Sequence, residues 1–121
     1  MSAPCSHTPV VLVVDDEAII RMNAADMLAD EGFATIEACD AEDAFAEILR
    51  HPEISVLFTD INMPGQFDGL ELARLVHEYR PDIRLILTSG RSPPAASEIP
   101  DAGRFLSKPY DQASLAKLVA A

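Results

Sequence analysis

Two adjacent carboxylates, Asp15 and Asp16, follow the apolar run VVLVV, and a third carboxylate, Glu17, comes directly after them. Like charges this close repel one another, and burying even one of them is costly unless a positive group neutralises it. Either water solvates these side chains or a cation belongs beside them. The pattern therefore directs attention to a metal ion or a basic side chain as the partner of the acidic pair.

Three further strand-like segments also end in residues that can do chemistry. Asp60 ends LFTD, Thr88 and Ser89 end RLILTS, and Lys108 follows RFLS. In an open parallel sheet, functional groups gather at the carboxyl ends of the strands, beside the crevice where the connections change direction. We therefore expect these side chains to meet at one site, although either hydroxyl, that of Thr88 or that of Ser89, could point into it.

The carboxylates of Asp15, Asp16 and Asp60 would together make a strongly negative pocket. Such a pocket suits Mg²⁺, a hard cation that prefers oxygen ligands and retains several waters. A carboxylate beside such a cation can attack a phosphoryl group, because the cation offsets the charge on the phosphoryl oxygens. Lys108 would add a positive charge and Ser89 a hydroxyl donor for the same oxygens. The residues thus indicate a phosphate-binding site that contains its own nucleophile.

The elements that position these residues are predicted from an alternation of short apolar runs with longer amphipathic segments. Parallel strands need crossover connections, which helices supply, so the alternation predicts an α/β fold with a parallel sheet covered on both faces. The expected strands are residues 10–14, 34–38, 55–59, 84–88 and 104–107. The expected domain covers residues 10–121, after a flexible leader at residues 1–9.

Helical periodicity predicts a first helix that ends near Gly32 and a second helix capped by Asp40. A third helix should stop before Pro81, and a last one should close the chain. The side chains expected on their apolar faces are Ile19, Ile20, Met22, Met27 and Leu28 in the first, Ala44, Phe45, Ile48 and Leu49 in the second, and Leu70, Leu72, Leu75, Val76 and Tyr79 in the third. The segment GRSPPAASEIPDAG holds three prolines and no helical stripe, which predicts a short or irregular fourth helix.

Four segments, VLVVDDEAIIR, LFTDINMPG, ILTSG and FLSKPY, resemble in order, type and spacing the signature segments of the receiver domain of two-component response regulators. The resemblance runs from about Val10 to the end of the chain. It implies a flavodoxin-like fold with strand order 2-1-3-4-5. It also implies a stand-alone signalling module rather than an enzyme, one that assists its own phosphoryl transfer and dephosphorylation.

Carried over residue by residue, the resemblance assigns a role to each polar residue of the proposed site. Asp60 is implied to be the phosphoacceptor, and Lys108 is implied to contact the phosphoryl group. Mg²⁺ is implied to bind Asp15, Asp16, Asp60 and the backbone carbonyl of Asn62. Ser89 matches the hydroxyl that moves toward phosphate, in preference to Thr88, and Phe105 matches the switch aromatic. The Lys108-Pro109 step resembles one that is often cis in the family.

Two departures from the family pattern concern the loops. The segment MPGQFDGLEL is one residue longer than the commonest loop, and the proline-rich segment from Arg91 to Pro100 replaces a regular fourth helix on the usual output face. In the family, positions equivalent to Asn62 and Arg91 tune the lifetime of the acylphosphate. We therefore hypothesise that Arg91 changes that lifetime.

Composition excludes several classes of protein. The chain has 121 residues, of which 49% are hydrophobic and 24% charged, a balance typical of one globular domain. A net charge of −11 disfavours direct contact with nucleic acid or anionic lipid. No apolar run is long enough to span a bilayer, and two cysteines, Cys5 and Cys39, suit a reducing cytoplasm. The expected partners are a sensor histidine kinase or phosphotransfer protein and an unidentified downstream protein.

Two alternative functions compete with the receiver. One is a degenerate receiver that binds partners without phosphorylation, although the full set of acidic, hydroxyl and lysine residues argues against it. The other is a Mg²⁺-dependent aspartyl phosphatase of the haloacid dehalogenase kind, which needs an Asp-x-Asp pair after the first strand and a substrate-binding cap. The sequence leaves open whether the chain forms a homodimer and whether it is part of a longer regulator or hybrid kinase.

Overall fold

Strands and helices alternate along the chain in the computed structural model, which describes residues 8–65, 67–91, 93–100 and 103–121. The elements are β1 (Val10–Val14), α1 (Ala18–Asp30), β2 (Ala34–Ala38), α2 (Ala41–Arg50), β3 (Val56–Asp60), α3 (Gly69–Tyr79), β4 (Arg84–Ser89), the 3₁₀ helix η1 (Ala96–Glu98), β5 (Arg104–Ser107) and α4 (Gln112–Ala120). All five expected strands are present; β3 lies one residue later than expected, and β4 ends one residue later. Most of the expected leader, residues 1–7 with Cys5, lies outside the described residues.

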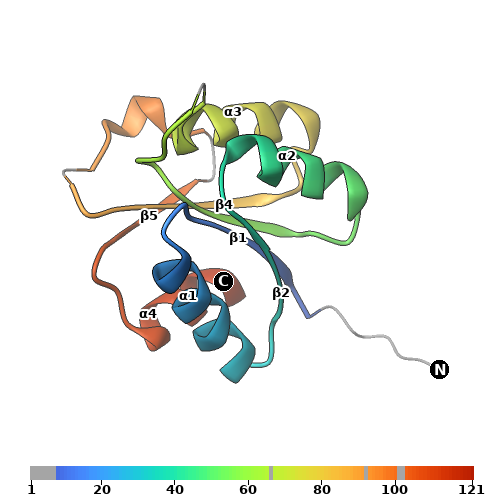
Figure 1. Cartoon of the computed structure of the whole chain (residues 1–121), viewed down its shortest axis with the longest axis vertical. Helices are drawn as coiled ribbons and strands as arrows, with labels where there is room; N and C mark the ends of the chain where they lie inside the picture. The colour runs from blue at the N-terminus through green and yellow to red at the C-terminus, as the bar shows by residue number, and fades with distance from the viewer. Residues whose placement is uncertain (1–7, 66, 92, 101–102) are drawn as a thin grey trace.

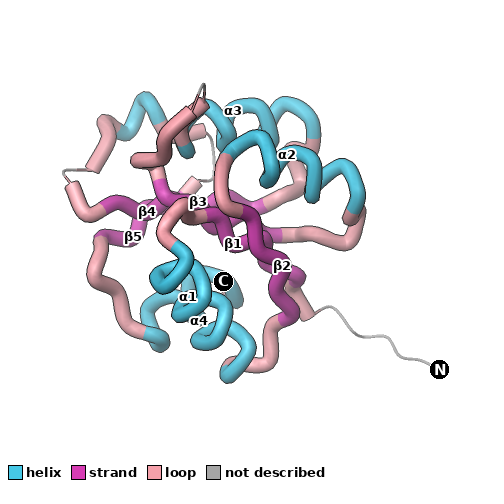
Figure 2. The backbone as a smooth tube through the Cα atoms, viewed as in Figure 1, coloured by secondary structure: helices cyan, strands magenta, loops and turns pink. Residues whose placement is uncertain are grey.

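The five strands form one parallel sheet in the order β2-β1-β3-β4-β5, which confirms the predicted topology. Helices α2 and α3 cover one face of the sheet, and α1 and α4 cover the other (Figure 1). The tube view shows the strands as a single layer between these two helical layers (Figure 2). Because β1 and β3 are neighbours, the residues that follow them leave the same edge of the sheet side by side.

Each central strand is buried on both faces because it contributes alternate side chains to two separate cores. Toward α1 and α4 the sheet presents Val11, Val13, Val56, Phe58 and Ile86. Toward α2 and α3 it presents Leu12, Val14, Leu57, Leu85 and Leu87. This division explains why VVLVV is apolar at every position.

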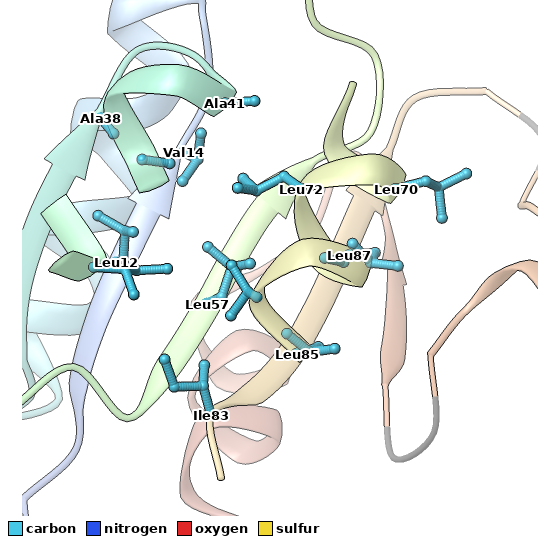
Figure 3. Close-up of a cluster of buried hydrophobic side chains, with 14 of the residues drawn as sticks. Leu12, Val14, Ala38, Ala41, Leu57, Leu70, Leu72, Ile83, Leu85 and Leu87 are labelled. Carbon is cyan, nitrogen blue, oxygen red and sulfur yellow. The ribbon is translucent and has the colours of Figure 1, made fainter. Parts of the chain in front are cut away.

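Figure 3 shows the core beneath α3, where Leu72 lies close to the leucines of β3 and β4. Leu57, Leu72 and Leu87 are each 1% exposed or less. Burying a leucine side chain completely stabilises the fold by about 1.5 to 3 kcal/mol. This core therefore helps to fix the position of the carboxyl end of β3 relative to that of β4.

Side chains or glycines mark the helix ends, largely as the sequence predicts. The Asp40 carboxylate accepts a hydrogen bond from the Asp43 backbone N–H at 2.8 Å and caps α2. Asp68 and Glu71 form a reciprocal capping box at the start of α3. Gly32, at φ +90°, lies just beyond the end of α1, which is a backbone conformation that favours glycine.

The predicted apolar face of α1 is wrong for two of its residues. Ile19 is 73% exposed and Met22 is 54% exposed, whereas Ala24, Ala25 and Leu28 are buried. Apolar residues occur around most of this helix, so their periodicity does not single out one face. The small alanines face the sheet, where they allow α1 to approach closely, and the larger side chains of Ile19 and Met22 lie outside that contact.

The predicted faces of α2 and α3 are too wide. Leu49 is 55% exposed, Leu75 39% and Tyr79 54%. By contrast, Ile48 of α2 and Val76 of α3 are buried. A helix lying on a sheet buries only the stripe that faces the strands, so the residues at the margins of each apolar face stay accessible. Tyr79 instead packs edge-on against Phe45, with ring centroids 5.7 Å apart.

The connection between β4 and β5 holds only the three-residue helix η1 among its described residues. This outcome confirms the predicted short, irregular fourth helix. Within the part of the chain that the structure describes, every helix is too short or too polar to cross a membrane.

Candidate functional site

An acidic pocket lies at the carboxyl edge of the sheet, where β1 and β3 end. Asp15 follows β1 and Asp60 is the last residue of β3; they are 3% and 4% exposed, respectively, whereas Asp16 is exposed. Carboxylate oxygens of these three residues all lie within 4.8 Å of one another. The structure thus brings together the three carboxylates that the sequence places at two strand ends.

Lys108 enters the pocket from the end of β5 and supplies its positive charge. Its Nζ lies 3.1 Å from Asp15 Oδ2 and 3.1 Å from Asp60 Oδ2. The Lys108-Pro109 peptide bond is cis, in agreement with the sequence expectation. The lysine thereby offsets part of the repulsion between the two buried carboxylates, as the acidic pattern in the sequence requires.

Burial changes the protonation of this pocket. It raises the pKa of the Asp60 carboxyl, and the hydrogen bond from Lys108 offsets this effect only in part. For Lys108, burial acts to lower the pKa, but the hydrogen bonds to Asp15 and Asp60 outweigh burial, so the net pKa is raised and the side chain remains an ammonium. Nearby, burial raises the pKa of Tyr110 to about 12, so its phenol stays neutral at pH 7.

The donor set of the pocket fits Mg²⁺. All three side chains offer carboxylate oxygens, the ligand type that a hard divalent cation prefers. Oxygens bound to one Mg²⁺ lie roughly 3 to 4 Å apart, since each sits about 2.1 Å from the ion. The carboxylate oxygens, now within 4.8 Å of one another, would need to move only slightly closer together to bind the ion. Asp16 is exposed, which leaves room for the waters that Mg²⁺ retains.

Hydrogen bonds from α1 hold the turn that carries Asp15. The Glu17 backbone N–H donates to Asp15 Oδ1 at 2.9 Å, and Arg21 Nη1 donates to the Asp15 backbone carbonyl at 2.9 Å. Arg21 is itself anchored by an ion pair with Glu37, Nε to Oε1 at 3.0 Å. This role of Arg21 was not predicted from the sequence, although a basic residue about one turn into a helix can reach back to the preceding loop.

Asn62, in the loop that follows β3, and Gly69, the first residue of α3, hold the backbone and side chain around Asp60. The Asn62 backbone N–H donates to Asp60 Oδ1 at 3.2 Å, and the Gly69 N–H donates to the Ile61 carbonyl at 3.0 Å. A Cβ atom on Gly69 would lie 2.0 Å from the Asp60 carbonyl oxygen, so only glycine fits there. No sequence signal identified this contact, because it depends on how closely α3 approaches β3.

The two hydroxyls at the end of β4 have different surroundings. Ser89 is buried, and its Oγ donates to Asn62 Oδ1 at 2.6 Å while accepting from the Arg91 backbone N–H at 3.0 Å. Thr88 is also buried, but its Oγ1 has no hydrogen-bond partner among the described residues. Ser89, the residue favoured by the family resemblance, is therefore the hydroxyl that is connected to the acceptor loop.

Phe105 lies on β5, opposite Leu87 of β4. It is half-buried and packs against the core beneath α2 and α3. The structure therefore places Phe105 beside β4 and against the core, and its part in a switch stays a prediction.

An open hollow of about 500 Å³ adjoins the pocket between α1 and the residues after β5. Its lining includes Ile20, Ala24 and Met27 of α1, together with Lys108 and Tyr110. The Tyr110 ring packs edge-on against Phe58, with centroids 5.4 Å apart, which fixes one wall of the hollow. A molecule approaching Lys108 from this side would contact mainly apolar surface.

Comparison with known proteins agrees with this geometry. The sequence model of one protein family, described as the response regulator receiver domain, matches residues 11–120 of this chain. The chain is 39% identical over 82 residues to the nitrogen assimilation regulatory protein NtrX of Azorhizobium caulinodans, which covers 66% of this chain and 18% of that protein. It is 33% identical over 119 residues to the sensor kinase CckA of Brucella abortus, which covers 94% of this chain and 12% of the kinase.

A solved structure gives the same result over nearly the whole chain. The crystal structure of a response regulator receiver protein from Pseudomonas putida matches with a TM-score of 0.84 and 31% identity, covering 99% of this chain and 98% of that chain. By contrast, the chain spans less than a fifth of the length of the two curated relatives.

Proposed function

Because the chain belongs to the response regulator receiver domain family, we propose that Asp60 accepts a phosphoryl group from a phosphohistidine on a sensor kinase or phosphotransfer protein. The observation that carries the proposal is the position of Lys108 Nζ, 3.1 Å from both Asp15 and Asp60, beside a third carboxylate. This arrangement pairs a nucleophilic carboxylate with a cation that can follow the phosphoryl oxygens, and it leaves the remaining acidic groups for a metal ion.

In the proposed reaction, a carboxylate oxygen of Asp60 forms a bond to phosphorus while the phosphorus–nitrogen bond of the donor breaks. The donor imidazole leaves with the electron pair of that bond and takes up a proton. Lys108 shifts its hydrogen bonds from the carboxylates to the phosphoryl oxygens, where negative charge accumulates. The Asn62 backbone N–H holds Asp60 in orientation by its hydrogen bond to Oδ1.

Mg²⁺ is part of this proposal. Asp15, Asp16, Asp60 and the backbone carbonyl of Asn62 would hold it, and a bound Mg²⁺ supplies charge neutralisation for the phosphoryl oxygens during transfer. The support on this chain is the all-oxygen donor set and its spacing. Because Asp60 is both a ligand and the acceptor, the metal and the phosphoryl group would share one carboxylate.

We propose that the phosphodonor docks over the hollow between α1 and Lys108. A phosphohistidine must come within bonding distance of Asp60, so its protein has to contact the surface that borders the pocket. That surface is largely apolar, since Ile20, Ala24 and Met27 line the hollow, and the same helix exposes Ile19 and Met22. Output would pass to a downstream protein by contact or phosphate transfer.

Intact mass after incubation with acetyl phosphate tests the proposal directly. The wild-type chain should gain the mass of one phosphoryl group in the presence of Mg²⁺, because acetyl phosphate supplies a phosphoryl group without a docking partner. The gain should disappear when Mg²⁺ is chelated and in Asp60→Asn, which removes the nucleophile. Asp26→Asn, a matched substitution at an exposed position of α1, should gain the same mass as wild type.

Two outcomes would contradict the proposal. A mass gain that survives in Asp60→Asn would move the acceptor to another residue. No gain from acetyl phosphate or from a panel of phosphorylated kinases, in a protein that still binds Mg²⁺, would favour the degenerate receiver. The aspartyl phosphatase has less support, since the chain carries Asp15-Asp16-Glu17 after β1 and its nucleophile candidate lies on β3.

A further inference from the structure

The single proton of the Ser89 hydroxyl is already donated to a partner other than Asp60. The hydroxyl donates this proton to Asn62 Oδ1 at 2.6 Å, and its oxygen accepts from the Arg91 N–H at 3.0 Å. Ser89 itself is 2% exposed, whereas Asn62 is an exposed residue, so the bond between them is part-buried. To donate to a phosphoryl oxygen on Asp60, this hydroxyl must first release the Asn62 side chain, because a hydroxyl has only one proton to give.

Asn62 contacts both parts of the proposed switch. Its backbone N–H donates to Asp60 Oδ1 at 3.2 Å, and its side-chain carbonyl accepts from Ser89. One residue therefore connects the acceptor carboxylate on β3 to the hydroxyl on β4. The family resemblance assigns to Asn62 a backbone carbonyl for the metal and an effect on acylphosphate lifetime; neither involves this side-chain hydrogen bond.

We propose that the Asn62 side chain is a positioning residue that holds Ser89 in its unphosphorylated orientation and competes with the phosphoryl group for the Ser89 proton. This inference rests on the proposed function and adds a regulatory element to it. The resting state keeps the Ser89–Asn62 bond, and the phosphorylated state exchanges it for a bond from Ser89 to a phosphoryl oxygen. The strength of the Asn62 contact thus sets how readily the domain responds.

The competition between Asn62 and the phosphoryl group for the Ser89 proton should change the affinity for a phosphoryl mimic by a measurable factor. A neutral hydrogen bond of this kind shifts an equilibrium by about two- to tenfold. Removing the acceptor should destabilise the resting orientation of Ser89 and leave the bond to the phosphoryl oxygen intact. Binding of a phosphoryl mimic should therefore become about two- to tenfold tighter in Asn62→Ala.

The experiment titrates the purified chain with beryllofluoride and Mg²⁺, which places a tetrahedral trifluoride group on a carboxylate oxygen. Binding is followed by the backbone amide resonances of Ser89, Gly90 and Arg91. In Asn62→Ala we expect tighter binding, and the Arg91 amide of the unliganded protein should shift toward its beryllofluoride-bound position. Gln112→Ala removes a side-chain amide of α4 that bonds Glu31 away from the pocket; it is the control and should behave as wild type.

A double-mutant cycle with Ser89→Ala separates this role from any other effect of Asn62. Without the hydroxyl there is nothing for Asn62 to hold, so Asn62→Ala should leave beryllofluoride affinity unchanged in the Ser89→Ala background. An equal gain in affinity in both backgrounds would overturn the inference, because access to the pocket rather than Ser89 would then be responsible. Unchanged affinity of Asn62→Ala in the wild-type background would overturn it as well.

Failure of the inference differs from failure of the proposed function. If wild type binds no beryllofluoride and gains no mass from acetyl phosphate or from the panel of phosphorylated kinases, Asp60 is not an acceptor and the proposed function fails. If wild type binds the mimic and the cycle shows no coupling, the receiver function stands and only the role of Asn62 is lost.

Discussion

One ammonium group forms ion pairs with two buried carboxylates at the proposed site. Lys108 Nζ is equidistant from Asp15 and Asp60, both almost fully buried, so its removal leaves the acidic pocket without its neighbouring cation. The same ammonium occupies space and charge that a divalent cation would otherwise use. Lys108 should therefore oppose metal binding while it assists phosphoryl transfer, and a single substitution can separate these two effects.

Replacing this lysine by methionine, Lys108→Met, should change the two activities in opposite directions. The affinity for Mg²⁺, measured by calorimetric titration, should rise several-fold because a competing positive charge is gone. The rate of phosphorylation by acetyl phosphate should fall by about 10²-fold, as expected for loss of a charge-stabilising donor. A decrease in both quantities would indicate a distorted pocket instead. Lys117→Met, on the C-terminal helix, serves as the control for removing a lysine charge.

At this scale the sequence predicts the residue types well and their contacts poorly. Asp15, Asp60 and Lys108 were predictable because each follows a strand, and parallel strands end at the same edge. The bond between Ser89 and Asn62 was not predictable, since it depends on side-chain orientations across two adjacent strand ends. Nor does the order of residues signal that the Thr88 hydroxyl lacks a hydrogen-bond partner among the described residues.

Among the elements, α3 approaches the site closely through its first residue, Gly69. A Cβ atom on Gly69 would lie 2.0 Å from the Asp60 carbonyl oxygen and 2.8 Å from the Ile61 Cα. These are backbone atoms of the acceptor strand and its loop, so they cannot move aside as a flexible side chain would. The start of α3 and the end of β3 are therefore positioned against each other.

Gly69→Ala should consequently weaken both the fold and the site. Overpacking of this kind costs about 1 to 3 kcal/mol of unfolding free energy, measured by urea denaturation, and should slow phosphorylation of Asp60 by acetyl phosphate. Gly90→Ala is the matched control because a Cβ atom there meets nothing within 4 Å and its backbone lies outside the positive-φ region. Equal stability of the two variants would contradict the predicted clash.

The C-terminal helix offers a pH-dependent test at the same scale. The Asp111 side chain caps α4 by accepting from the Ser114 N–H at 2.7 Å, and hydrogen bonding with Ser114 lowers the pKa of this carboxyl. A lowered native-state pKa means that the cap stabilises the fold above the ordinary value near 3.8, and that this stabilisation is lost as the pH falls through the native value.

Asp111→Asn should therefore show a smaller loss of stability than wild type when urea denaturation is compared between pH 7 and pH 3. The amide retains a hydrogen-bond acceptor, so the helix keeps part of its cap, but it has no proton to gain in this range. Asp30→Asn, at the exposed end of α1, provides a control for removing one negative charge. The prediction is wrong if Asp111→Asn and wild type lose stability equally.

The helices also show where sequence patterns stop being informative. Strands such as VVLVV are recognisable because they are apolar throughout, and the caps at Asp40 and Gly32 follow from local rules. The prediction for α1 was wrong at Ile19 and Met22, which are exposed, whereas Ala24, Ala25 and the predicted Leu28 are buried. A helix with several apolar stripes buries the one that packs against the strands. Those strands are distant in the sequence, so the periodicity of the helix alone does not predict the buried stripe.

For the whole molecule, a net charge of −11 coexists with a pocket where three carboxylates converge. Self-repulsion of such a chain is relieved by any added salt, but only a bound cation relieves it at one place. Specific and general effects of Mg²⁺ on stability can therefore be separated by comparing salts at equal ionic strength and by altering one carboxylate of the pocket.

Millimolar MgCl₂ should raise the midpoint of thermal unfolding of wild type more than NaCl at the same ionic strength, because Mg²⁺ binds the folded pocket and not the unfolded chain. At a concentration a hundred times the dissociation constant the stabilisation is about 2.7 kcal/mol, or roughly 10 °C for a domain of this size. Asp16→Asn should lose this excess, since it removes an exposed carboxylate of the pocket and leaves the buried ion pairs of Lys108 in place. If Asp16→Asn retains the full excess, Mg²⁺ acts elsewhere on the acidic surface, and the carboxylates at the sheet edge are not its site.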